Sequence, residues 1–190
     1  MACIAGAGFL ILGSRGFSAR ERPSPVESWF AVRVRSAAIP EAARHQANPV
    51  ADSEEMLAGA EAHWADHCAA CHANDGSGDS PMGRNTYPPA PDMRLAATQQ
   101  KTDGELFFAI QNGVRFTAMP AWGSGSSHDE EESWKLVRFI RHLPNLTAQE
   151  KKQMERLNPK SPDEIREELE EEKFLKGEDT HEPEIQHHHH

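Results

Sequence analysis

The chain has 190 residues, a formal net charge of -10 and a mean hydropathy of -0.70, with 37% hydrophobic and 26% charged residues. This composition allows one small domain with appendages and excludes a membrane protein of several spans. The acidic balance argues against a nucleic-acid partner, because phosphate binding requires a basic surface. Three cysteines are too few for a disulfide scaffold.

An apolar stretch over residues 2–13 is the first predicted element. It is shorter than a transmembrane helix, which needs about 20 residues, and it has the length of a signal-peptide core. No basic residue precedes it, whereas three arginines follow it, which is the reverse of an ordinary signal peptide. We therefore expect residues 1–19 to be either a signal peptide or a membrane anchor. In the second case they would attach the protein to the membrane.

Residues 20–52 are predicted to form a linker, because their four prolines interrupt any long helix. A short helix or strand could form around the apolar side chains Trp29, Phe30, Val32 and Val34. The linker would either pack on the following domain or lie near a membrane surface. Residues 1–52 carry a net charge of +2, whereas residues 53–146 and 147–190 each carry -6.

The predicted core domain, residues 53–146, reads as helices joined by long loops. Asp52 and Glu55 predict a capping box for a first helix, whose apolar residues recur every four positions at Met56, Ala60, Trp64 and Cys68. A Gly- and Pro-rich loop follows over residues 74–91. A second helix is predicted over residues 105–112, with a capping box of Thr102 and Glu105 and with Gly113 as stop. A third is predicted over residues 130–143, with Trp134, Val137 and Ile140 on one face. No stretch alternates between polar and apolar residues, so the predicted fold is all-α.

Residues 147–190 are predicted to be a polar, acidic and partly helical tail. Ser161, Pro162 and Glu164 give the signature of a helix start, and we expect this helix to reach Lys176. Its run of glutamates is interpreted as a solvated face, although such acidity could also steer a basic redox partner. Residues 187–190 are histidines, which are either native or part of a purification tag.

The motif that carries chemistry is Cys68-Ala69-Ala70-Cys71-His72. Two thiols three residues apart on a helix point the same way, so each can form a thioether bond to a haem vinyl group. The adjacent His72 can then ligate the iron, and this is the known pattern of c-type haem attachment. The alternatives are a redox-active cysteine pair, which expects a βαβ setting, and half of a zinc site, which needs two further ligands. Neither context is present in the sequence.

A second axial ligand is expected on the other face of the iron. The candidates are Met82, Met93, Met119 and the remaining histidines. Met119 is favoured because it lies 47 residues beyond His72, far enough for the chain to wrap around the ring, and is followed by Pro120 and Trp122. A thioether opposite a histidine is a known cytochrome arrangement.

Residues 53–146 therefore resemble a class I monohaem c-type cytochrome of the bacterial exported or membrane-anchored kind. The resemblance rests on the CxxCH, the Gly/Pro-rich loop, the Met119-Pro120-Ala121-Trp122 segment and the last aromatic helix. It implies one covalent haem c in a small helical domain with long loops, attached at Cys68 and Cys71 and ligated by His72 and Met119. It also implies that a carbonyl of Pro88, Pro89 or Pro91 orients the histidine.

The resemblance implies a one-electron carrier, not an enzyme, that passes electrons between periplasmic or membrane redox partners. A subunit of an oxidoreductase complex fits the same expectation. The alternatives are a haem enzyme or gas sensor with a labile sixth ligand, and a metal-binding protein that uses the histidine-rich tail. Because haem attachment to CxxCH takes place outside the bacterial cytoplasm, we expect a periplasmic or otherwise extracytoplasmic location, either free or anchored to the inner membrane.

Overall fold

The computed structural model describes residues 18–176. All regular elements in this range are helices, which confirms the predicted all-α fold. Within the same range, no helix combines the length and the apolar character needed to span a bilayer. The expected signal peptide or anchor lies almost entirely outside the described residues, and the terminal histidines lie wholly outside them.

The chain divides into two compact units, residues 1–158 and residues 159–190. The second unit contains one described helix, α11 (Pro162–Leu175), which begins with the predicted capping box of Ser161 and Glu164. Every described residue of this unit is exposed. Its polar, solvated character agrees with the tail expected from the sequence.

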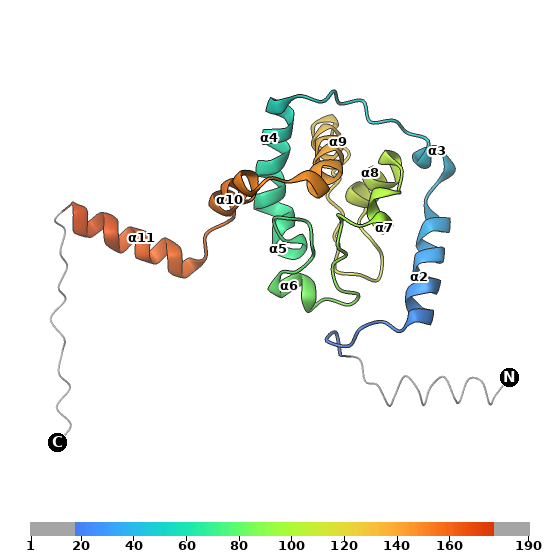
Figure 1. The fold of residues 1–190 in the computed structure, drawn as a ribbon, viewed down its shortest axis with the longest axis horizontal. Coiled ribbons are helices and arrows are strands. Elements are labelled where there is room, and N and C mark those ends of the chain that lie inside the picture. Colours follow the sequence, from blue (N-terminus) through green and yellow to red (C-terminus); the bar gives the residue numbers. More distant parts are fainter. Residues whose placement is uncertain (1–17, 177–190) are drawn as a thin grey trace, which may run out of the picture. The chain divides into compact units, whose positions relative to one another are not determined.

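The core of the first unit is built from α4 (Glu54–His63), α8 (Asp103–Asn112) and α9 (Ser127–His142). α9 packs against both α4 and α8 (Figure 1). Trp64 and Trp134 are buried, as the apolar stripes predicted, and the Trp134 ring stacks on Phe107 at 4.0 Å between centroids. Burial of these aromatic side chains is a large part of the favourable free energy of folding in such a small domain.

The helix ends follow local capping chemistry. α8 has the predicted capping box of Thr102 and Glu105. The predicted cap of α4 was wrong by one residue: the side chain of Ser53, not Asp52, accepts the hydrogen bond from the Met56 backbone N–H. Ser53 has the extended backbone that an N-cap requires. α9 begins three residues before the predicted start.

Further helices complete the first unit. They are α2 (Pro25–Ala38), α3 (Glu41–Arg44), α6 (Pro81–Arg84), α7 (Ala96–Gln99), the 3-10 turn η2 (Leu143–Asn145) and α10 (Ala148–Leu157). α6 lies within the predicted loop 74–91. α10, which the sequence grouped with the tail, contacts α4 and buries Met154 completely.

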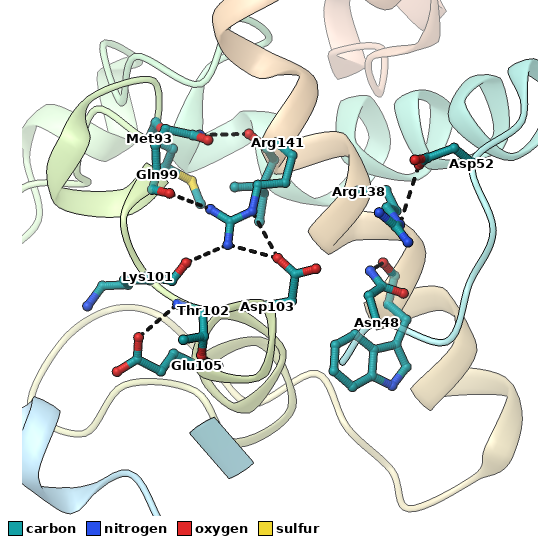
Figure 2. A network of polar contacts seen from close by, with 12 residues as sticks. Asn48, Asp52, Met93, Gln99, Lys101, Thr102, Asp103, Glu105, Arg138 and Arg141 are labelled. Carbon is teal, nitrogen blue, oxygen red and sulfur yellow. Dashed lines mark hydrogen bonds and ion pairs between the residues drawn. The ribbon is translucent and has the colours of Figure 1, made fainter. Parts of the chain in front are cut away.

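Two arginines of α9 attach irregular segments to the helical core (Figure 2). The Arg141 guanidinium donates to the carbonyls of Gln99 and Lys101 and forms an ion pair with Asp103 at 2.8 Å. Arg138 donates to the Val50 carbonyl from both Nε and Nη2. These charge-assisted bonds satisfy loop carbonyls that would otherwise lack partners in a half-buried setting.

Candidate haem site

The CxxCH lies where α4 changes its helical geometry. α4 runs into a π-helical turn, η1 (Trp64–Cys68), which is followed by α5 (Ala69–His72). The Ala69 backbone N–H donates to the Trp64 carbonyl five residues earlier. Such wide turns occur frequently at functional sites. Cys68 ends the π turn, while Cys71 and His72 lie in α5, and the two thiols are unpaired.

Side chains outside the motif fix its backbone. The Ser80 hydroxyl lies within hydrogen-bond distance of the carbonyls of Ala70 at 2.6 Å and of Cys71 at 3.1 Å, and it accepts from the Gly83 backbone N–H. The Trp64 indole donates to the Ala73 carbonyl at 3.1 Å. These bonds satisfy carbonyls at the end of α5 that have no partner within the helix.

Close packing between α5 and α6 depends on a glycine. A Cβ atom at Gly83 would lie 2.1 Å from the Cys71 carbonyl oxygen, so a side chain at this position would push α6 away from the motif. Sequence reasoning missed both Ser80 and Gly83. The signal was present, since Ser80-Pro81 has the cap and first-turn proline of a helix start and Gly83 follows three residues later.

The buried setting of His72 favours the neutral form of its imidazole ring. Burial lowers its pKa, which favours the uncharged ring, and metal binding requires that form. Its Nδ1 atom is buried without a hydrogen-bond partner among the described residues. The expected hydrogen bond from Nδ1 to a proline carbonyl is therefore not formed. The Pro88 carbonyl instead accepts from the Thr86 hydroxyl at 3.1 Å.

The Cys68 thiol does not have the properties of a redox nucleophile. Burial and, to a smaller extent, the neighbouring Cys71 raise its pKa to about 12. Redox-active cysteine pairs instead contain a thiol of lowered pKa, because the thiolate is the attacking species. Within residues 18–176, no group of three or more His, Cys, Asp or Glu side chains is arranged to hold a metal ion.

Met119 lies half-buried in the loop between α8 and α9, residues 113–126. Its carbonyl accepts from the Val114 backbone N–H at 3.1 Å, and its own N–H donates to the Thr117 hydroxyl at 3.1 Å. Gly113 opens the loop with a φ of +65°, and a Cβ there would lie 2.7 Å from the backbone of Pro120 and Ala121. The local backbone around Met119 is therefore closely constrained.

The same loop returns to the end of α8 and reaches the helix that carries the CxxCH. The backbone N–H groups of Trp122 and Gly123 donate to the Ile110 and Gln111 carbonyls at 3.0 and 3.1 Å. The Trp122 ring contacts the His67 ring edge to face, with 5.6 Å between centroids. His67 directly precedes Cys68, so the loop of Met119 and the attachment motif share one region of the domain.

The other methionine candidates have different surroundings. Met82 lies in α6 with a relative exposure of 57%. Met93 packs against the buried core, and its backbone N–H donates to the Gly76 carbonyl at 2.8 Å. Both Met82 and Met119 lie on segments that contact the helix of the motif, and Met119 is the half-buried one of these two.

The residues present fit a covalently attached haem. Two unpaired thiols and a neutral imidazole lie on one short helical stretch. Apolar side chains are exposed on the neighbouring segments, Met82 on α6 and Trp122 on the loop between α8 and α9. An apolar macrocycle bound at the motif would give such side chains a surface to pack on.

Residues 55–140 match the protein family described as cytochrome c oxidase, cbb3-type, subunit III. These residues form a c-type cytochrome domain. The match spans a little under half of the chain and contains both the CxxCH and Met119. Comparison with curated proteins finds no match. The cytochrome domain binds one haem c covalently, with Cys68 and Cys71 at the attachment spacing.

Proposed function

We propose that this chain is a one-electron carrier of the class I type whose haem iron is ligated by His72 and Met119. Bound haem supplies a one-electron iron(III)/iron(II) couple. Two ligands from the chain itself leave no coordination position for a substrate. The role that fits is electron transfer between redox protein partners, not catalysis on a small molecule.

The position of the Met119 loop carries this proposal. Hydrogen bonds hold the loop to the end of α8, and the contact between Trp122 and His67 joins it to the helix of the CxxCH. A methionine in such a constrained segment needs little further ordering to act as a ligand. Ser80 has the corresponding role on the histidine side, because its hydroxyl fixes the carbonyls of Ala70 and Cys71.

We also propose an extracytoplasmic location, because c-type cytochrome domains are typically found there. The matched family takes its name from an oxidase subunit, so a subunit of a larger oxidoreductase complex is a second setting for the same electron-transfer role. In both settings the partner is a redox protein. Residues 1–19 would be removed on export or retained as an anchor.

Replacing Met119 tests the ligand assignment directly. In haem-loaded Met119→Ala, we expect loss of the weak methionine–iron absorption band, a lower reduction potential and binding of carbon monoxide by the reduced protein. Met82→Ala is the matched control and should retain the wild-type spectrum. An unchanged band in Met119→Ala would refute the assignment. Ready binding of carbon monoxide by the reduced wild type would instead favour a gas sensor or haem enzyme.

A further inference from the structure

α2 exposes an unusual amount of apolar surface for a helix within the predicted linker. None of its residues is buried, and its five large apolar side chains are between 49% and 75% exposed. These are Val26, Trp29, Phe30, Val32 and Val34. Val26, Phe30 and Val34 recur at intervals of four and therefore lie on one helix face.

α2 is a well-formed helix attached to the cytochrome unit. Pro25 occupies its first turn, and Ser24 and Glu27 form a capping box. The Tyr87 hydroxyl donates to the Glu27 carboxylate at 2.9 Å near one end, and the Arg44 guanidinium donates to the Ser36 carbonyl near the other. These bonds hold the helix at both ends while its apolar face stays exposed.

The charge of this region differs from that of the rest of the chain. Residues 18–44 contain five arginines and three glutamates, in a protein whose net charge is -10. The Arg33 guanidinium lies over the Trp29 ring at 5.4 Å from its centroid, which places a cation beside the exposed apolar face. Tryptophan and arginine together suit the boundary between lipid headgroups and acyl chains.

We propose that α2 lies on the surface of an anionic phospholipid bilayer, with Val26, Phe30 and Val34 facing the acyl chains, and holds the cytochrome domain there. Basic residues are attracted to anionic headgroups, whereas an overall acidic protein would otherwise be repelled. This attachment is separate from the expected role of residues 1–19 and does not depend on the haem ligands. It would keep the electron carrier close to redox partners in the membrane.

The test compares two faces of α2 in the full-length, haem-loaded protein. In a Cys3→Ser background, an environment-sensitive fluorophore is placed on Phe30→Cys or, as the matched control, on Ser28→Cys, an exposed position on the other side of the helix. Cys68 and Cys71 are bound to haem and do not react with the label. Vesicles of phosphatidylcholine alone are compared with vesicles that also contain phosphatidylglycerol.

With anionic vesicles, we expect the fluorescence emission of the label at position 30 to shift to the blue. The emission of the label at position 28 should shift little. Anchoring through residues 1–19 alone would leave both labels in water and overturn the proposal, as would equal shifts at the two positions. A blue-shifted emission of the label at position 30 before vesicles are added would show that another segment or a second copy of the chain covers the apolar face of α2. This result would also overturn the proposal.

A second measurement uses partitioning of the unlabelled protein. The double variant Trp29→Ser/Phe30→Ser should bind anionic vesicles at least about tenfold more weakly, because two large apolar side chains no longer enter the interface. Leu169→Ser/Phe174→Ser removes comparable exposed side chains from α11 and should leave binding unchanged. Equal effects of the two double variants would contradict a specific role for α2.

Discussion

Glu61 shows how one residue can oppose the stability of the domain at neutral pH. It lies in α4 with a relative exposure of 5%, and its Oε1 atom has no hydrogen-bond partner among the described residues. Burial raises its pKa above the ordinary value, the Glu150 carboxylate raises it further, and His142 opposes the change. His142 lies 2.7 Å from the Glu150 carboxylate, and the two groups shift the pKa of Glu61 in opposite directions.

We predict that Glu61→Gln stabilises the domain at pH 7 but not in acid. A carboxyl whose pKa is raised on folding favours the folded state below its ordinary value of 4.5, and this contribution is lost as the pH rises through the folded pKa. A neutral amide avoids the cost of the buried charge, so the free energy of unfolding should increase by about 1 kcal/mol at pH 7. Denaturant unfolding of the haem-loaded protein at pH 7 and about pH 4 measures the difference.

Glu155→Gln, at an exposed position of α10, is the control and should change stability little at either pH. An equal gain at both pH values for Glu61→Gln would show that packing, not charge, causes the effect. Destabilisation at pH 7 would show that the ionised carboxylate is well accommodated in the folded protein.

The positions of α5 and α6 around the CxxCH depend more on how closely their backbones approach each other than on buried side chains. α6 has only four residues, too few to form a stable helix by itself. Its position is fixed by the Ser80 hydroxyl and by the absence of a side chain at Gly83. Both features act on the carbonyl groups of α5, so the attachment motif and α6 form one structural element.

Gly83→Ala should therefore destabilise the domain. The added methyl group would lie 2.1 Å from the Cys71 oxygen and 2.6 Å from the Gly78 oxygen, and backbone atoms cannot move aside as a flexible side chain can. Overpacking of this kind costs about 1–3 kcal/mol. Gly59→Ala is the matched control: it meets no atom within 4 Å and lies inside α4, so it should stabilise by about 0.5–1 kcal/mol.

Thermal unfolding and the yield of haem-loaded protein measure both glycine variants. If Gly83→Ala were as stable as the wild type, α6 would be free to shift without disturbing α5, and the proposed role of this close approach would be wrong.

Local signals predicted some elements of this fold and missed others for physical reasons. The capping box of Thr102 and Glu105 was recognised because it depends on four consecutive residues. The same pattern at Thr147 and Glu150 begins α10, but the many charged residues around it led to the prediction of a tail. The burial of Met154 and the environment of Glu61 depend on contacts between segments far apart in sequence, which periodicity does not report. The π turn that ends at Cys68 also has no sequence signature that we could recognise.

The same holds for the site: features set by neighbouring residues could be predicted, whereas those set by contacts between distant segments could not. The spacing within the CxxCH defines the attachment chemistry, and Cys68 and Cys71 lie at this spacing in the matched cytochrome domain. The ligand role of His72 stays a prediction from the same motif. The proline carbonyl expected to orient His72 was not confirmed, because it depends on how the following loop closes. The axial role of Met119 stays a prediction, supported by the contact between Trp122 and His67.

At the scale of the whole molecule, the division between the two units gives a prediction about where the folded part ends. The first unit extends to residue 158 and includes α10, whereas all described residues of the second unit are exposed. α10 contributes the fully buried Met154 to the core and contacts both α4 and η1, the turn that carries Cys68. Stability should therefore depend on α10 and not on residues 159–190.

Two truncations separate these contributions. A chain that ends at Asn158 should retain the haem spectrum and the denaturation midpoint of the full-length protein. A chain that ends at Leu146 exposes the apolar surface that Met154 covers, at a cost of about 1.5–3 kcal/mol for that side chain alone. It should unfold at a lower denaturant concentration than the full-length protein. The haem spectrum should also change at a lower denaturant concentration, because η1 loses its contact with α10. Equal midpoints for the two truncations would show that α10 is dispensable and that the cytochrome domain ends at the boundary predicted from the sequence.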